Sequence, residues 1–316
     1  MKLGANDPLS GAAQPLVSVI LPVRNRAHCV GRAIASVLAQ SYAPIELIVV
    51  DDGSSDATAD VVGAFGGQVR LVRQAPAGTY AARNAGLAVA RGELIAFIDS
   101  DDAWFPDKLT RQVALMRPGI GLVFGDAIHV SAPRRDAPRL GVTSFEIAPP
   151  RRGHCAPALA NCNFLPTCTV LVRRSALDAV GGFSEAQPVS ADYLAWVRIA
   201  LRTGLDFVDE PVAEYTVHAG GISFDLGCNL AARIGLFQAE LAATADPRAR
   251  ALLRRILFNT SLSLALATLR GRARNVRRPL QIAWRGGLRP ARLSAASWAT
   301  RFLANQLWVR TRRLRT

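Results

Sequence analysis

The chain has 316 residues, half of them hydrophobic and a fifth charged, which is enough for one large domain with a substantial core. This composition excludes a disordered chain. The first fifteen residues lack a long apolar core, and the longest apolar runs are far shorter than the roughly 20 residues that span a bilayer, so we expect a cytoplasmic protein without a signal peptide. The five cysteines form no Cys-x-x-Cys pair, which favours reduced core residues over a structural zinc site.

The positive charge is concentrated toward the C-terminus. Residues 247–316 contain seventeen arginines and no Asp, Glu or Lys, whereas the whole chain carries a net charge of +14. Subtracting those seventeen charges leaves −3 for residues 1–246. An arginine-only segment suits anionic lipid head groups, phosphorylated lipids or nucleic acid as partners.

The first third of the chain alternates between strand and helix patterns. Strands separated by helices of about ten residues favour right-handed crossovers and a parallel sheet, whose loops at the carboxyl ends of the strands face a ligand. The expected elements are strands over Val17 to Leu21, Glu46 to Val50, Val69 to Val72 and Leu94 to Ile98, and helices over Val30 to Leu38 and Tyr80 to Ala90.

The second third is less regular. The stretch around residues 133–153 is rich in Pro and Arg and is expected to be a surface excursion. After roughly residue 224 only helical patterns remain. The expected elements before that point are strands over Gly121 to Phe124, Thr169 to Val172 and Val212 to Val217, and a helix over Asp192 to Leu201.

Three carboxylates stand within four positions, at Asp99, Asp101 and Asp102, directly after a predicted buried strand. Carboxylates crowded this closely repel one another unless a cation or a hydrogen-bonding ligand lies among them. The run therefore predicts a divalent metal that holds the diphosphate of a nucleotide-activated substrate. The competing interpretation is an acidic cap on a helix that begins near Pro106.

Four motifs resemble glycosyltransferase family 2 between about residues 16 and 223. They are Val-Ser-Val-Ile-Leu-Pro-Val-Arg-Asn (17–25), Val-Val-Asp-Asp-Gly-Ser-Ser-Asp (49–56), Ala-Arg-Asn-Ala-Gly (82–86) and Ala-Arg-Gly-Glu-Leu-Ile-Ala-Phe-Ile-Asp-Ser-Asp-Asp (90–102). One motif alone would be weak, but the ordered set is specific. The resemblance implies an α/β protein of GT-A fold, with a Rossmann-like, mostly parallel sheet and a helical C-terminal appendage.

The resemblance also implies a division of the chain. Residues 1–15 would be a tail and residues 16–224 the GT-A catalytic domain, of which 16–118 form the nucleotide-binding half and 119–224 the acceptor half. Residues 225–316 would be an arginine-rich helical region.

The resemblance places the nucleotide at Pro22, Asn25 and Asp52, and the donor diphosphate near Arg83. A carboxylate at Asp52 could accept the N3 hydrogen of uracil or thymine, which favours a UDP- or dTDP-sugar. Taken without the family, the aspartates at this point would be turn residues and helix caps, and Arg83 a solvated helix residue.

The acidic run matches the DXD-type element of the family, with Asp99 and Asp101 at the nucleotide sugar and Asp101 and Asp102 at the metal, which would be Mn or Mg. His218 matches a family position near the metal and the diphosphate, where an imidazole can bind either. Without that match, a single loop histidine would ordinarily be solvated.

The catalytic base is expected at Asp192, because residues 190–200 resemble the acceptor-side helix of the family. Two acids that often accompany the base are replaced by Ala191 and Leu194, which puts the acceptor contacts in doubt. Glu185 is an alternative base. The competing interpretation of Asp192 is a carboxylate that only stabilises the N-terminal end of the helix. Inversion at the anomeric carbon is implied by the family alone.

The arginine-rich end has two interpretations of equal weight. Leu293 to Leu314 mixes Trp and other apolar residues with arginines, which suits an amphipathic helix on an anionic membrane surface. The alternative is a helical appendage packed on the core or on a second subunit, and nucleic acid is the least favoured partner. In Gln281-Ile282-Ala283-Trp284-Arg285 the last two residues are reversed relative to the Gln-x-x-Arg-Trp of processive synthases, which favours a single addition.

These patterns predict a metal-dependent, inverting glycosyltransferase that moves one sugar from a nucleotide diphosphate donor to a hydroxyl of a glycan or lipid-linked acceptor. Surface polysaccharide synthesis, at the cytoplasmic face of the membrane, is the expected setting. Two other classes stay open. A sugar nucleotidyltransferase should carry a Gly-rich phosphate loop after the first strand, and Pro22-Val23-Arg24-Asn25 is not one. A catalytically silent module that binds nucleotide sugar or glycan is compatible with Ala191 and Leu194.

Overall fold

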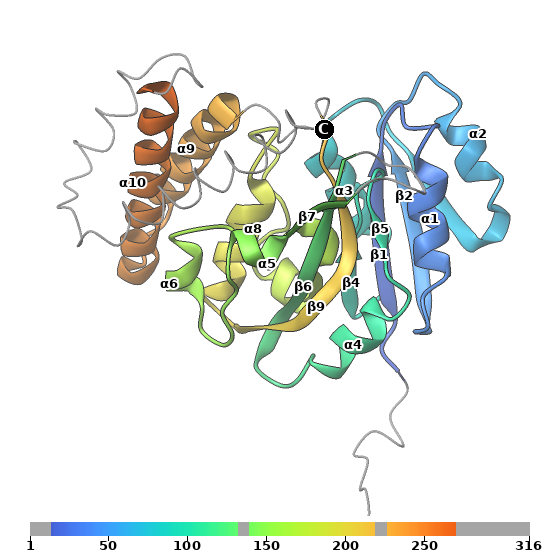
Figure 1. Cartoon of the computed structure of the whole chain (residues 1–316), viewed down its shortest axis with the longest axis horizontal. Helices are drawn as coiled ribbons and strands as arrows, with labels where there is room; N and C mark the ends of the chain where they lie inside the picture. The colour runs from blue at the N-terminus through green and yellow to red at the C-terminus, as the bar shows by residue number, and fades with distance from the viewer. Residues whose placement is uncertain (1–13, 132–138, 219–225, 270–316) are drawn as a thin grey trace, which may run out of the picture.

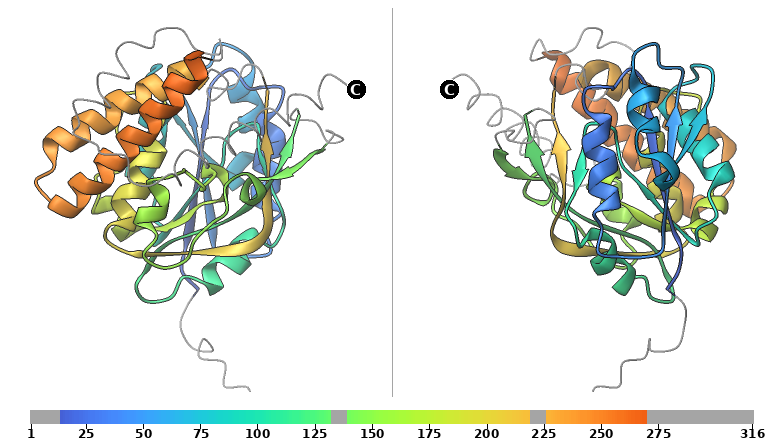
Figure 2. Two further views of the ribbon diagram at one scale, coloured as in Figure 1. Left: turned by 60° about the vertical axis from the view of Figure 1, so that its left-hand side comes forward. Right: turned by 90° about the vertical axis from the view of Figure 1, so that its right-hand side faces the viewer.

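A computed structural model describes residues 14–131, 139–218 and 226–269 (Figure 1). Its centre is a nine-stranded sheet in the order β3-β2-β1-β4-β8-β6-β9-β5, with β7 paired to β6. Helices cover the sheet on both faces, and a pair of long helices lies at one end of the molecule (Figures 1 and 2). The predicted α/β class and mostly parallel sheet are confirmed.

The first half of the sheet is parallel, because β1 pairs in parallel with both β2 and β4, and β2 with β3. The side chains of β1 and β4 are buried on both faces, as expected for strands enclosed between helices. Every element predicted here is present, with ends that differ by at most two residues. The elements are β1 (Val17–Val23), α1 (Val30–Leu38), β2 (Ile45–Asp51), α2 (Thr58–Gly63), the 3₁₀ turn Gly66–Gln68, β3 (Val69–Arg73), α3 (Thr79–Val89) and β4 (Leu94–Phe97).

The second half of the sheet is mixed. Strand β8 runs antiparallel to β4 and β6, whereas β9 runs parallel to β6. The helix expected from Pro106 begins two residues later. The elements are β5 (Ala103–Trp104), α4 (Lys108–Ala114), β6 (Ile120–Val130), β7 (Arg139–Thr143), α5 (Ser144–Ile147), α6 (Ala156–Leu159), the 3₁₀ turn Thr167–Thr169, β8 (Leu171–Arg173), α7 (Arg174–Asp178), α8 (Ala191–Ala200) and β9 (Gly204–Thr216).

The long strands β6 and β9 depart most from the sequence prediction, which covered only residues 121–124 and 212–217. Acidic residues interrupt the apolar patterns of both strands. In the fold these residues are buried and form hydrogen bonds or ion pairs with other segments. Asp126 accepts a hydrogen bond from the backbone N–H of Phe145 at 2.9 Å, and Asp206 forms ion pairs with Arg117 and Arg152. The expected surface excursion contains β7 and α5, whose start carries a capping box.

Helix α9 (Leu226–Ala243) and helix α10 (Pro247–Leu269) pack against each other, and α9 also packs on α8 (Figure 2). Leu230, Ile234 and Phe237 of α9 are buried in the core, and Arg198 of α8 forms an ion pair with Glu240. Within the described ranges, no helix combines the length and the apolarity needed to cross a bilayer.

Several predictions concern residues outside those ranges. The amphipathic segment 293–314 and the motif at 281–285 lie there, as does most of the N-terminal tail. The division of the chain into a catalytic and a helical region stays a prediction.

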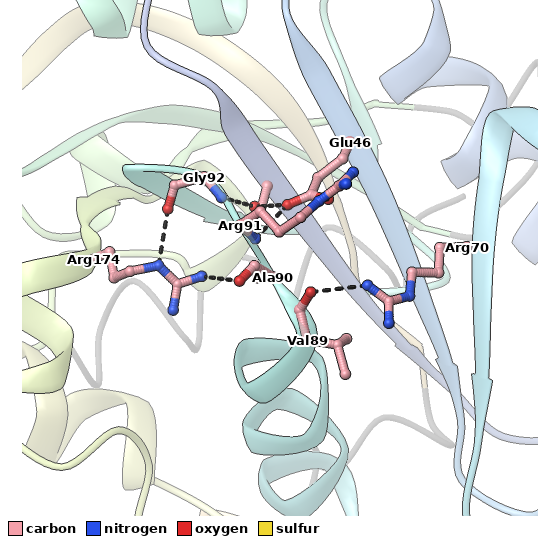
Figure 3. A network of polar contacts seen from close by, with 8 residues as sticks. Glu46, Arg70, Val89, Ala90, Arg91, Gly92 and Arg174 are labelled. Atoms are coloured by element: carbon pink, nitrogen blue, oxygen red, sulfur yellow. Dashed lines mark hydrogen bonds and ion pairs between the residues drawn. The ribbon is translucent and has the colours of Figure 1, made fainter.

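Helix α3 is fixed at its C-terminal end by three arginines from other elements or the following loop (Figure 3). Arg174 donates to the carbonyl of Ala90 at 2.6 Å, and Arg70 donates to the carbonyl of Val89 at 3.0 Å. Arg91 pairs with Glu46 of β2. The contacts of Arg174 and Arg70 satisfy carbonyls that the end of a helix leaves free. The N-terminal end of α3 is thereby held at the opposite edge of the sheet, where the acidic loops lie.

Candidate active site

The predicted site residues gather at the carboxyl edge of the parallel strands, because the acidic loops follow β2 and β4 on either side of β1. The end of β9 is bonded to the same place. Thr216 donates its backbone N–H to Asp102 Oδ1 at 2.8 Å and its hydroxyl to the carbonyl of Asp101 at 2.6 Å. Two segments more than a hundred residues apart in sequence therefore form one surface.

Asp101 and His218 face each other at this junction. His218 Nε2 lies 2.8 Å from Asp101 Oδ2, and both side chains are partly exposed. A carboxylate and an imidazole suit Mn or Mg when substrate phosphates and water complete the coordination. Among the described residues, no group of three or more Asp, Glu, His or Cys side chains could hold a metal ion. Asp101 and His218 would supply two ligands, and substrate phosphates and water would supply the others.

Asp102 points inward. It is 2% exposed and accepts the hydrogen bond from Thr216, while its Oδ2 atom has no hydrogen-bond partner within the described residues. Burial, together with the charges of Asp101 and Asp99, raises the pKa of the Asp102 carboxyl well above its ordinary value. Asp102 therefore joins the acidic loop to β9 through this hydrogen bond.

Asp99 pairs with Arg83 of α3, whose Nη2 atom lies 2.6 Å from Asp99 Oδ1. The Arg83 side chain is 4% exposed, so it is not the solvated helix residue that the sequence left open. Burial raises the pKa of Asp99, and the guanidinium offsets part of the rise. In the structure, Arg83 therefore binds Asp99 of the acidic loop. The family resemblance places the donor diphosphate near this arginine.

Asp192 lies in the first turn of α8, after Ser190, which caps the helix with a left-handed φ of 67°. Two side-chain hydroxyls hold its carboxylate: Tyr80 donates to Oδ1 at 3.1 Å and Thr167 donates to Oδ2 at 2.7 Å. Burial, and next the charge of Asp192, raises the pKa of Tyr80 far above its usual value, so this hydroxyl stays protonated and donating.

The acidic loop and Asp192 are connected through α3. The Arg83 guanidinium, which binds Asp99, lies 5.4 Å from the centre of the Tyr80 ring, and Tyr80 binds Asp192. Tyr80 and Arg83 are three residues apart, so they share one face of the helix. The sequence prediction missed Tyr80 and Thr167. The spacing to Arg83 was the one available signal for Tyr80, and no local signal marks Thr167.

Asp52 organises the loop that leads into α3. It accepts hydrogen bonds from the Gln74 side chain at 2.8 Å and from the backbone N–H groups of Ala77 at 2.7 Å and Gly78 at 2.8 Å. A carboxylate offers about four acceptor positions, so one remains for a ligand. Its contact with a pyrimidine base stays a prediction.

Asn25 joins the ends of β1 and β2. Its Oδ1 atom accepts a hydrogen bond from the backbone N–H of Ser55 at 2.8 Å, and its own backbone N–H donates to the Ser54 hydroxyl at 2.9 Å. The residue has a left-handed φ of 52°, which asparagine tolerates better than most residues. Pro22 lies opposite Val50 in the sheet. Both residues lie at the carboxyl ends of these strands, and their part in nucleotide binding stays a prediction.

The remaining candidates lie at the surface or in the core. Glu185, the alternative base, is exposed and accepts a hydrogen bond from Asn84 at 2.7 Å. Ala191 and Leu194 are 1% and 2% exposed in the main core cluster, so apolar residues at these positions pack α8 against the sheet. Trp104 and Trp196 are also buried.

Comparison with known proteins identifies relatives of this chain. The family model described as "Glycosyl transferase family 2" matches residues 18–181. An uncharacterized glycosyltransferase of Rickettsia felis is 30% identical over 212 residues, which are 63% of this chain and 33% of the relative. The Escherichia coli protein WfgD, named as a UDP-Glc:alpha-D-GlcNAc-diphosphoundecaprenol beta-1,3-glucosyltransferase, is 42% identical over 114 residues, 35% of this chain and 45% of WfgD. The chain thus spans between a third and a half of the length of these two curated relatives.

Solved structures share the fold. S. aureus TarS in complex with UDP-GlcNAc matches with a TM-score of 0.59 and 18% identity, over 79% of this chain and 72% of TarS. Mannosyltransferase PcManGT from Pyrobaculum calidifontis, in complex with GDP-Man and Mn²⁺, matches with a TM-score of 0.60 and 20% identity, over 96% of this chain and 88% of PcManGT. These similarities confirm the predicted GT-A type of fold.

Proposed function

Because the chain belongs to glycosyl transferase family 2, we propose that it transfers one sugar from a nucleotide diphosphate donor to an acceptor hydroxyl, with inversion at the anomeric carbon. The observation that supports this most is the placement of Asp192. Its carboxylate is held by two hydroxyls and is connected through Tyr80 and Arg83 to the acidic loop. This connection supports Asp192 as the base that would act on the acceptor next to the residues proposed to bind the donor.

On the donor side, Asp101 and His218 would hold Mn or Mg, which when bound supplies charge neutralisation for the departing nucleoside diphosphate. Asp102 supports this pair from inside the fold by binding the backbone of Thr216. Arg83 and Asp99 would meet the phosphates and the ribose. Asp52, Asn25 and Pro22 would form the nucleotide pocket, with UDP- or dTDP-sugars favoured through the free acceptor position of Asp52.

On the acceptor side, Asp192 would take the proton of the hydroxyl group as its oxygen attacks the anomeric carbon. The new glycosidic bond forms while the bond from that carbon to the diphosphate oxygen breaks, and the electron pair leaves with the nucleoside diphosphate. Tyr80 and Thr167 would keep the carboxylate in place for the acceptor, since each hydroxyl binds a different oxygen of the group.

The acceptor is proposed to be a glycan or a lipid-linked sugar used in surface polysaccharide synthesis. The name of WfgD, which states a diphosphoundecaprenol-linked acceptor, supports the lipid-linked class. The arginines of residues 247–316 would favour an anionic membrane surface, and a peripheral position on the cytoplasmic face follows from that proposal.

The proposed function is tested by incubating the full chain with a panel of nucleotide sugars and measuring nucleoside diphosphate release, with and without an added acceptor glycoside. We expect release with at least one UDP- or dTDP-sugar in the presence of Mn²⁺, and its loss when EDTA is added. Thermal stabilisation by a nucleotide sugar without any turnover would favour the silent binding module instead.

Tyr80→Phe is expected to lower kcat for sugar transfer about 10- to 100-fold with little change in the donor KM, because it removes one hydrogen bond to the charged base. Steady-state kinetics check this. The matched control is Tyr42→Phe, which removes the hydroxyl that binds the carbonyl of Pro15 at 2.6 Å, away from the site. Equal losses in the two variants would contradict a positioning role for Tyr80.

A further inference from the structure

A loop between α6 and the 3₁₀ turn connects the helix pair to the base. Asn259 of α10 donates to the carbonyl of Ala160 at 2.9 Å, and Arg255 donates to Asn161 Oδ1 at 2.7 Å. The same loop continues to Thr167, whose hydroxyl binds Asp192. Helix α10 therefore contacts the loop that leads to Thr167, on the side proposed for the acceptor.

Arg233 of α9 contacts α8, the helix that carries the base. Its Nε atom donates to the Ser190 hydroxyl at 3.1 Å, and its guanidinium lies 5.1 Å from the centre of the Tyr193 ring. Ser190 and Tyr193 flank Asp192 in the sequence, and the Cα atoms of residues 190 and 192 are less than about 8 Å apart. Arg233 thus lies beside the first turn of α8, which carries the base.

Arg233 and Arg255 lie at similar distances along their helices from the connection between α9 and α10. A short connection at residues 244–246 makes α9 and α10 antiparallel (Figure 2). Arg233 precedes this connection by eleven residues, and Arg255 follows it by nine. The two arginines therefore come from adjacent stretches of the helix pair, with Arg255 bonded to the loop and Arg233 to the N-cap residue of α8.

Neither guanidinium is neutralised within the part of the chain that the structure describes. No carboxylate there lies within ion-pair distance of Arg233 or Arg255, whereas Arg198 on the neighbouring α8 pairs with Glu240. Both side chains hold the loop or the helix cap through neutral oxygens only. A guanidinium bonded in this way keeps N–H donors and its full charge for an anion.

We infer that Arg233 and Arg255 form a binding site for the diphosphate group of the acceptor. This inference rests on the proposed function, because it takes Asp192 as the base. An acceptor sugar joined to diphosphate through its anomeric carbon presents a hydroxyl at one end and the phosphates at the other. The hydroxyl would meet Asp192, and the phosphates would meet the two arginines, whose planar N–H groups match phosphate oxygens.

The test compares equilibrium binding of three probes in EDTA: N-acetylglucosaminyl diphosphate with a short alkyl chain, the neutral alkyl glycoside of the same sugar, and inorganic pyrophosphate. We expect the wild type to bind the diphosphate-linked sugar at least about tenfold more tightly than the neutral glycoside. Arg233→Ala and Arg255→Ala should each reduce this preference, and the double variant should abolish it. Asp101→Ala should keep it, which separates this site from the donor site.

Arg254→Ala is the matched control, because Arg254 is exposed on α10 and makes no hydrogen bond or ion pair with any described residue. It removes the same charge and should preserve the preference. Circular dichroism would verify that every variant is folded, and Arg233→Lys gives a conservative second variant, expected to retain part of the preference.

Three outcomes would overturn the inference: a wild type without preference, a double variant that retains it, or pyrophosphate that binds as tightly as the diphosphate-linked sugar. The last would mean a site for free phosphate. Failure of the proposed function would be seen in a different measurement, as the absence of nucleoside diphosphate release. It would not change the ratio of the affinities for the diphosphate-linked sugar and the neutral glycoside.

Discussion

Asp192→Asn is expected to lower kcat for sugar transfer by about 10²- to 10⁴-fold, the range found when a general base is removed. The amide keeps the shape of the side chain and one oxygen that Tyr80 or Thr167 can still bond, but it cannot accept the proton of the acceptor hydroxyl. The donor KM should change little, because Arg83, Asp99 and the nucleotide loops are untouched. Steady-state kinetics at saturating acceptor would measure the effect.

The matched control for this prediction is Glu185→Gln, since Glu185 is the other carboxylate proposed from sequence as a base. It is exposed and is bonded to Asn84 rather than to the hydroxyl pair, so its variant should retain nearly normal kcat. If Glu185→Gln were the inactive variant and Asp192→Asn the active one, the assignment of the base would be reversed.

The parallel half of the fold was predictable because its information is local. Residues 94–98 form an unbroken apolar run, and residues 17–21 are interrupted only by Ser18. The helices between such runs carry clear amphipathic spacing, so period and length alone identify the elements. The edge where their loops meet follows from the crossover rule. The amino-acid pattern alone therefore places the acidic cluster at the same edge of the sheet as Asp52.

The mixed half was less predictable because its information is long-range. Asp126 and Asp206 interrupt the apolar patterns of β6 and β9, and their burial is offset by partners far away in the sequence. The same reason explains the site residues that were missed. Thr167 has no distinguishing neighbour in sequence, and its role arises only because the fold brings it 2.7 Å from Asp192.

The inward position of Asp102 also could not be read from sequence. Three aspartates within four positions look equivalent, yet the loop directs them differently: Asp99 to Arg83, Asp101 to His218, and Asp102 to the backbone of Thr216. Separate partners for each carboxylate reduce the repulsion that first indicated a cation. The proposed metal requirement consequently depends on Asp101 and His218.

Asp101→Ala is expected to raise the apparent Kd for Mn²⁺ at least about 100-fold, because the loss of a direct ligand should exceed the 10- to 100-fold effect typical of residues that only orient ligands. At limiting metal, kcat/KM should fall by a similar factor. His218→Ala should give the same phenotype, and the double variant should be little worse than either single variant, since both side chains serve one ion. Metal titrations followed by electron paramagnetic resonance and by activity would measure these effects.

Asp107→Ala removes an exposed carboxylate that pairs with Arg111 on α4, and it should leave metal affinity unchanged. Unaltered metal affinity in both Asp101→Ala and His218→Ala would exclude this pair as the metal ligands.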